Sequence, residues 1–148
     1  MADKSSLALR YTRFNLNRLS LSSRARVVSS DGFQRWQGNK KGIASKWDLI
    51  LANPPYLSAA DLKDLQPEVA WEPAEALDGG KDGLDFYRMI IHDAPAFLKP
   101  QGVLALEVGI GQARDVEEML EGSGAFDTVS IDQDDSRIDR VVMSRLRG

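Results

Sequence analysis

Five runs of mainly apolar residues along the chain predict β-strands. Residues 48–52 and 102–108 are almost continuously apolar, which is typical of strands buried in a parallel sheet. A shorter run at residues 26–28 predicts a third strand. The last two runs, residues 126–131 and 140–146, flank a short polar loop, and this spacing favours an antiparallel hairpin over a crossover.

Apolar residues at helical spacing predict helices between the strands. The first helix is expected over residues 7–19, after a capping serine at Ser5 or Ser6. Its expected buried face is formed by Leu7, Tyr11, Phe14 and Leu19. A short helix over residues 58–64 and an acidic amphipathic helix over residues 112–120 are also predicted.

A further helix is expected to begin at Asp82 or Asp85, since aspartate is a favoured N-cap. Pro95 is expected to kink this helix or to mark its last turns. The apolar side of the helix consists of Phe86, Met89, Ile90, Ala94, Phe97 and Leu98. Three segments have no clear period. Loops are expected over residues 37–46 and 66–85, and a turn is expected over residues 99–102.

The composition narrows the class of protein. Its 148 residues suffice for one domain, and its hydrophobic content of 43% is ordinary for a globular protein. Its net charge of −3 gives no overall electrostatic attraction to nucleic acid. The absence of cysteine and the single histidine exclude disulfides and thiolate or histidine-rich metal sites. No apolar run reaches the ~20 residues of a membrane span, and no signal peptide is recognisable. A cytoplasmic protein without membrane contact is therefore expected.

The segment Asn53-Pro54-Pro55-Tyr56 (NPPY) ends the predicted strand over residues 48–52. Two consecutive prolines have no N–H to donate, so the strand stops there. Asn53 and Tyr56 are therefore expected at the carboxyl end of the strand, where ligands bind in open α/β sheets. An amide beside an aromatic ring fits a flat, amide-like ligand. On the residues alone, Asn53 is equally well explained as a turn residue.

Several motifs resemble one family. The order of elements and NPPY resemble class I S-adenosylmethionine-dependent methyltransferases, in the branch that methylates adenine, guanine or glutamine nitrogen. The segment EPAEALDGGKDGLDFYR at residues 72–88 resembles the loop of the HemK/PrmC family, the release-factor glutamine-N5 methyltransferases. LEVGIGQ at residues 106–112 and DRVV at residues 139–142 match the same family.

The resemblance implies an α/β fold with a Rossmann-like sheet and a closing antiparallel hairpin. Family members also carry a helical N-terminal substrate-recognition domain, and a first strand that ends in a glycine-rich DxGxGxG loop. Residues 1–148 contain neither, so the chain is expected to be a partial catalytic domain. The 148-residue polypeptide alone is expected to show negligible activity and weak or no cofactor binding.

The family also assigns roles to residues of this chain. The Asn53 side-chain oxygen and the Pro54 backbone carbonyl are expected to accept the two N–H groups of the substrate amide, while Tyr56 packs on its plane. Pro55 and Glu72 are expected to contribute to the substrate pocket. Asn53 is also expected beside the cofactor.

On the cofactor side, Asp3 matches the acid that binds the ribose hydroxyls of S-adenosylmethionine. Asp31 and Gly32 match the segment beside the adenine. A disordered terminal residue is the alternative for Asp3, and a plain Asp-Gly turn is the alternative for the other two.

The implied function is methylation of the glutamine in the Gly-Gly-Gln motif of class 1 peptide chain release factors. A nucleic-acid amino methyltransferase is the alternative within the same chemistry. Arg10, Arg13 and Arg18 form only a modest basic cluster, so direct nucleic-acid binding is not expected. A non-catalytic fragment is the third hypothesis.

Overall fold

The structure is a computed structural model that describes residues 1–37, 46–65, 67 and 69–148. The chain divides into two compact units, Met1–Ala44 and Ser45–Gly148. The loop predicted over residues 37–46 lies outside the described residues except for its two ends.

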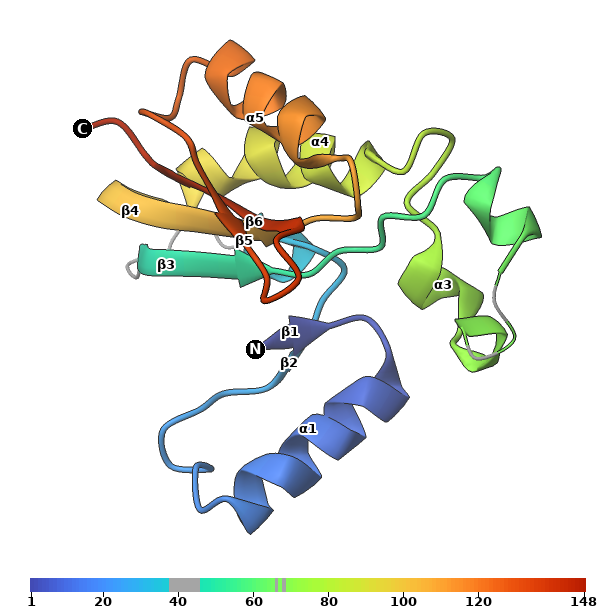
Figure 1. The fold of residues 1–148 in the computed structure, drawn as a ribbon. Coiled ribbons are helices and arrows are strands. Elements are labelled where there is room, and N and C mark those ends of the chain that lie inside the picture. Colours follow the sequence, from blue (N-terminus) through green and yellow to red (C-terminus); the bar gives the residue numbers. More distant parts are fainter. Residues whose placement is uncertain (38–45, 66, 68) are drawn as a thin grey trace. The chain divides into compact units, whose positions relative to one another are not determined.

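The described residues of the first unit form a two-stranded parallel sheet, a first helix (Figure 1) and a shorter second helix. Its elements are β1 (Ala2–Asp3), α1 (Ser6–Arg18), β2 (Val28–Ser29) and α2 (Gln34–Gln37). Strands β1 and β2 pair with Asp3 opposite Ser29. The Ser5 hydroxyl accepts the Ala8 N–H at 3.2 Å, which confirms a serine cap on the first predicted helix.

The predicted buried face of α1 is wrong. Leu7, Tyr11, Phe14 and Leu19 are 55 to 64% exposed, whereas Leu9 and Leu16 are the buried residues. Leu9 and Leu16 lie two turns apart on one side of the helix, and α1 packs against β1 and β2. The helix therefore carries two apolar stripes, of which the smaller is buried.

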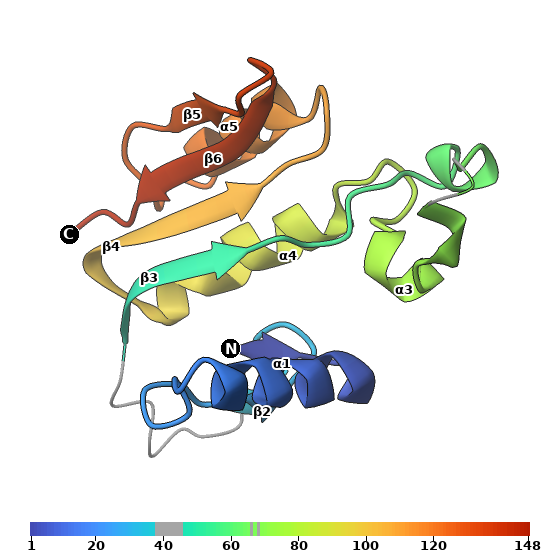
Figure 2. The same ribbon diagram turned by 60° about the horizontal axis from the view of Figure 1, so that its bottom comes forward.

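The second unit is a mixed four-stranded sheet with helices on one face (Figures 1 and 2). The sheet order is β3 (Trp47–Ala52), β4 (Leu98–Glu107), β6 (Asp139–Arg145) and β5 (Ser130–Gln133). Strands β3 and β4 are parallel, and β5 and β6 form the predicted antiparallel hairpin. Helices α4 (Asp85–Asp93) and α5 (Ala113–Gly122) cover the sheet. The largest fully buried side chains include Tyr87, Phe126, Leu98, Leu104, Leu106 and Leu120.

Two predictions about the strands of this unit are wrong. The turn expected over residues 99–102 is part of β4, which begins at Leu98 and accommodates Gln101 at a φ of +64°. Strand β3 is only partly buried: Ile50 is 8% exposed, but Leu49 and Leu51 are 49% and 72% exposed. Leu49 and Leu51 share the face opposite to Ile50, since side chains alternate along a strand.

The start of α4 also differs from the prediction. Leu84 is its N-cap, and Asp85 is already its first residue. Neither aspartate caps the helix because Asp82 accepts the Leu84 N–H and both carboxylates bind Arg88. The helix ends at Asp93, and Pro95 lies in a 3-10 turn (Ala94–Ala96), so the prediction that Pro95 marks the last turns is confirmed.

The connection from β3 to α4 contains short helical turns. The helix predicted over residues 58–64 is a shorter 3-10 helix, η1 (Asp61–Lys63), where Ser58 N–H donates to the Asp61 carboxylate at 2.9 Å. The loop predicted over residues 66–85 contains the 3-10 helix η2 (Val69–Trp71) and α3 (Ala74–Leu77). Gln66 and Glu68 lie outside the described residues.

Among the described residues, none of the helices combines the length and the apolar character needed to cross a bilayer.

Candidate functional site

The NPPY segment follows directly on the last residue of β3. Pairing with β4 ends at Ala52, opposite Leu106, as the two prolines require. Pro54 is buried and anchors the segment, whereas Asn53 is exposed and Tyr56 is half-buried. No residue of the described part of the chain hydrogen-bonds the Asn53 side chain. An exposed amide thus lies at the carboxyl end of a parallel strand, the edge where ligands bind in open α/β sheets.

The backbone after NPPY pairs with the long loop before α4. Leu57 N–H donates to the Leu77 carbonyl at 2.9 Å, and Gly79 N–H donates to the Leu57 carbonyl at 2.8 Å. Ala59 N–H donates to the Gly80 carbonyl at 3.1 Å. The structure therefore brings together two motifs that are separate in the sequence, the NPPY segment and the later part of residues 72–88.

Glycine allows this close approach of two backbones. A Cβ on Gly79 would lie 2.9 Å from the Pro55 carbonyl oxygen and 2.8 Å from that of Gly83. Gly80 has a φ of +92°, which side chains disfavour. Glu72 lies earlier in the loop, is exposed, and makes no hydrogen bond to NPPY within the described residues.

An ion pair closes the loop just before α4. The Arg88 guanidinium donates to both carboxylate oxygens of Asp82, at 3.0 and 2.5 Å, and to Asp85 at 2.9 Å. The hydrogen bonds from Arg88 are the main reason why the pKa of Asp82 is lowered from its usual 3.8 to about 2. A lowered pKa means that this contribution to stability is present above about pH 4 and is lost as the pH falls through about 2.

Replacing Arg88 with glutamine is expected to raise the pKa of Asp82 from about 2 towards 3.8, because the bidentate donor is lost. A carbon-detected NMR titration of the carboxyl groups measures this pKa. Arg114→Gln, which removes a different ion pair on α5, is the matched control and leaves Asp82 unchanged. An Asp82 carboxyl that still titrates near 2 in Arg88→Gln would contradict the assignment.

Two residues with no role expected from the sequence, Gln112 and Tyr87, lie against the same corner. The Gln112 side chain donates to the Tyr56 carbonyl oxygen at 2.9 Å. The Tyr87 hydroxyl donates to the Glu107 carbonyl at 3.0 Å and to Gln112 Oε1 at 3.4 Å. Both residues belong to the family motifs quoted above, and this membership was the only signal in the sequence that they matter.

The residues expected on the cofactor side lie in the first unit. Asp3 ends β1, where its carboxylate accepts the Ser5 N–H at 2.7 Å, so it is an ordered residue. Asp31 and Gly32 follow β2 in a turn, with Gly32 at a φ of +49°. The parallel pairing of β1 and β2 brings Asp3 and the turn to the same sheet edge, as Ser30 N–H donates to the Asp3 carbonyl at 3.1 Å. Asp31 is exposed.

Two further polar residues have structural explanations. Arg140 forms an ion pair with Asp134 at 3.1 Å. The His92 side chain is 87% exposed and lies 2.9 Å from the Asp93 carboxylate. In the described part of the chain, no three His, Cys, Asp or Glu side chains are grouped so that they would hold a metal ion.

Known proteins similar in sequence carry the name release factor glutamine methyltransferase. The one from Geobacter sulfurreducens is 53% identical over 102 residues, which are 68% of this chain and 36% of that protein. The one from Rhodospirillum rubrum is 43% identical over 95% of this chain and 41% of its own length. The one from Cereibacter sphaeroides is 41% identical over 97% of this chain and 49% of its own length. The chain spans less than half the length of these relatives. No protein-family model matches the sequence.

Solved structures of methyltransferases share the fold. A methyltransferase from Pyrococcus furiosus has a TM-score of 0.70 at 18% identity, over 99% of this chain and 61% of that one. The hMettl16 catalytic domain, solved in complex with an RNA hairpin, has a TM-score of 0.69 at 15% identity, over 97% of this chain and 53% of that one. The predicted α/β fold of the class I methyltransferases is therefore confirmed.

Proposed function

This chain belongs to the HemK/PrmC family of release factor glutamine methyltransferases, and from that membership we propose its activity. The protein transfers a methyl group from S-adenosylmethionine to the side-chain nitrogen of a glutamine. The glutamine is that of the Gly-Gly-Gln motif in class 1 peptide chain release factors. The protein then acts in the cytoplasm, the compartment in which release factors terminate translation.

One observation carries this proposal: the hydrogen bonds that join the NPPY segment to the loop of residues 72–88. Leu57 pairs with both Leu77 and Gly79, so backbone hydrogen bonds join the two motifs just after the end of β3. Asn53, which is exposed, and Tyr56, which is half-buried, belong to the first of these motifs. The two motifs together distinguish the family, and their hydrogen bonding to each other supports the proposal that they serve one site.

The chemistry requires that a weak nucleophile be held in one orientation. A glutamine nitrogen shares its lone pair with the adjacent carbonyl, so it attacks only when positioned in line with the methyl group. The Asn53 side-chain oxygen and the Pro54 carbonyl accept its two N–H groups. Tyr56 packs on the amide plane and excludes water. Both acceptors gain strength as positive charge develops on the nitrogen.

The bond changes balance without a strong base. The glutamine nitrogen would form a bond to the methyl carbon as the carbon–sulfur bond breaks, and the sulfur would keep that bond's electron pair and leave as a neutral thioether. The nitrogen would then lose a proton to water. The product is the N-methylated amide. The roles of Pro55 and Glu72 in lining the pocket are part of the same proposal, and the exposed position of Glu72 leaves its carboxylate open to a partner.

The cofactor supplies an electrophilic methyl group on a sulfonium. The chemistry of the first unit fits its adenosine part: the Asp3 carboxylate suits two ribose hydroxyl donors, and Asp31 suits the adenine amino group. Both residues lie at the carboxyl ends of neighbouring parallel strands. The left-handed Gly32 turns the chain after Asp31.

Methylation of a nucleic-acid base is the less favoured activity. A nucleic-acid enzyme needs cationic side chains for phosphates. The chain has a net charge of −3, and the ion pairs of Arg88, Arg114 and Arg140 with acids engage several of its cations. The likeness to RNA-binding methyltransferases is one of fold alone.

The test is direct methyl transfer by the protein expressed from its whole gene. Incubation with S-adenosylmethionine and a class 1 release factor is expected to add one methyl group to the Gly-Gly-Gln glutamine, located by mass spectrometry of the tryptic peptide. A release factor with Gly-Gly-Ala in place of this motif is the control. Methylation of RNA or DNA instead, or of another residue of the release factor, would overturn the proposal.

A further inference from the structure

The side chain of Gln112 joins three segments at the NPPY corner. Its Nε2 donates to the Tyr56 carbonyl at 2.9 Å and to the Gly83 carbonyl at 3.5 Å. Its Oε1 accepts the Gly109 N–H at 3.1 Å. Gln112 thus links the residue that ends NPPY, the loop before α4, and the end of β4.

The surroundings fix the orientation of the Gln112 amide. The Gly109 N–H donates to its oxygen, and two carbonyl oxygens accept from its nitrogen. The Tyr87 hydroxyl shares its single proton between the Glu107 carbonyl and the Gln112 oxygen. A flipped amide would place donor against donor and acceptor against acceptor. The amide therefore occupies a single orientation and holds the Tyr56 carbonyl in one place.

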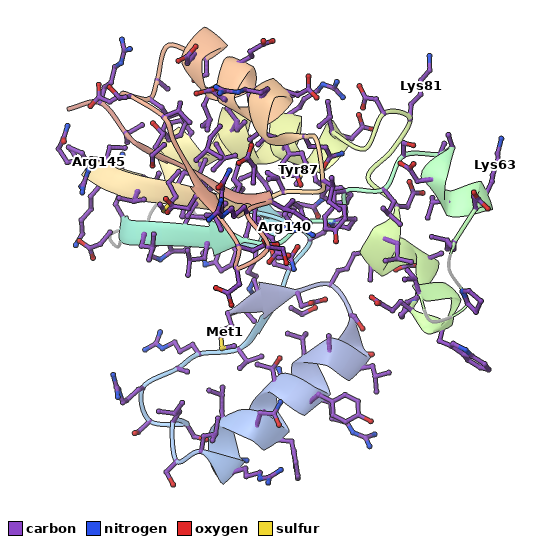
Figure 3. The ribbon with its side chains drawn as sticks, viewed as in Figure 1. Met1, Lys63, Lys81, Tyr87, Arg140 and Arg145 are labelled. Atoms are coloured by element: carbon purple, nitrogen blue, oxygen red, sulfur yellow. The ribbon has the colours of Figure 1, made fainter. Side chains whose placement is uncertain are left out.

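The Tyr87 hydroxyl contacts the oxygen of the Gln112 amide and supports this orientation. Tyr87 is a fully buried residue of α4, and its hydroxyl bonds the last residue of β4. Figure 3 labels Tyr87 and shows Lys63 and Lys81 extending outward. Burial raises the pKa of the Tyr87 hydroxyl. The hydroxyl therefore stays protonated and continues to donate over the pH range in which the protein is assayed.

Glycines leave room for the Gln112 amide. A Cβ on Gly109 would lie 2.7 Å from Gln112 Oε1 and 2.9 Å from the Tyr56 ring. A Cβ on Gly83 would lie 2.7 Å from Gln112 Nε2 and would meet the Tyr56 carbonyl oxygen. The backbone at Gly83 and Gly109 thus packs closely against the Gln112 amide and Tyr56. Such close packing is expected where a side chain is held in one orientation.

We propose that Gln112 is a positioning residue for the methyl-acceptor corner, which it holds by hydrogen-bonding the Tyr56 carbonyl from the start of α5. The inference rests on the proposed methyl transfer. Gln112 acts through the Tyr56 carbonyl and not on the reacting groups themselves. It fixes the peptide after Tyr56, and through it the ring of Tyr56 and the direction in which Asn53 and the Pro54 carbonyl point.

Replacing Gln112 with glutamate tests this role. Glutamate keeps the size and the acceptor for Gly109 but removes the donor to Tyr56. With the protein from the whole gene, kcat is expected to fall about 10–100-fold while KM for the release factor stays within about threefold, since misplacement of about 1 Å costs that much in rate. Gln101→Glu, the same change at the opposite end of β4, is the matched control and retains wild-type kcat.

A second measurement needs no catalysis. In ¹⁵N-labelled protein, the backbone amide resonances of Asn53, Tyr56 and Leu57 are expected to shift in Gln112→Glu and to stay in place in Gln101→Glu. Unshifted resonances, an unchanged kcat, or a loss confined to KM would each overturn the inference. A kcat that falls only in step with the folded fraction measured by circular dichroism would overturn it too.

The two measurements separate the failure of this inference from that of the proposed function. If the wild-type protein methylates no release factor, the proposed function fails, and the NMR comparison still decides whether Gln112 positions the corner. If the wild type is active and Gln112→Glu is equally active, only the positioning role fails.

Discussion

Replacing Asn53 with alanine is expected to lower kcat for glutamine methylation by about 10²–10³-fold, which is the typical cost of removing one preorganised polar group from a transition state. The substitution removes the exposed side-chain oxygen at the end of β3. That oxygen contributes more in the transition state than in the ground state, because the glutamine N–H becomes a stronger donor as the new bond forms. Mass-spectrometric time courses with the protein from the whole gene give kcat and KM.

The fold of the Asn53→Ala variant is expected to be unchanged, since β3 ends at Ala52 and the two prolines remain. Asn15→Ala, which removes an exposed amide on α1, is the control and keeps wild-type rates. A wild-type kcat in Asn53→Ala, or a loss that lies wholly in KM, would show that this amide does not act on the transition state.

The sequence was sufficient to place Asn53 at a strand end, because proline excludes a ladder hydrogen bond wherever it stands. It was not sufficient to predict the burial of β3. A continuous apolar run indicates a strand, but not how many neighbours the strand has. Among the described residues of the second unit, β3 pairs only with β4, and Leu51 is 72% exposed on the face opposite to Ile50.

The same limit explains the wrong face of α1. Two apolar stripes fit a period of 3.6 residues, one through Leu7, Tyr11 and Phe14 and one through Leu9 and Leu16. The first stripe is richer in large side chains and was predicted to be buried. Packing against β1 and β2 selects the second, and no local property of the sequence records that choice.

The candidate site was predictable where chemistry is local and not where it depends on distant pairing. NPPY and the loop of residues 72–88 are contiguous motifs, so both were found. The hydrogen bond from Gln112 joins residues 56 positions apart, and a side chain that bonds a backbone carbonyl leaves no pattern in the sequence of its partner. Tyr87 has the same property, since its acceptor is the carbonyl of Glu107.

Replacing Gly83 with alanine is expected to lower the free energy of unfolding by about 2–5 kcal/mol, from two separate causes. The residue has a φ of +79°, and a left-handed conformation costs an alanine about 1–2 kcal/mol. The new Cβ also meets the Tyr56 carbonyl and lies 2.7 Å from Gln112 Nε2, and such overpacking costs about 1–3 kcal/mol. Urea denaturation followed by circular dichroism measures the change.

Gly124→Ala separates the two causes. Gly124 also has a positive φ, of +66°, but nothing lies within 4 Å of its Cβ position, so only the backbone cost of about 1–2 kcal/mol applies. The excess cost at Gly83 therefore measures the contact with the NPPY corner. The Gly83→Ala variant is also expected to have a lower kcat, because the Tyr56 carbonyl must move to make room for the alanine side chain. Gly124→Ala is expected to keep the wild-type kcat. Equal costs in the two variants would mean that the corner yields freely and that its geometry is not held by this contact.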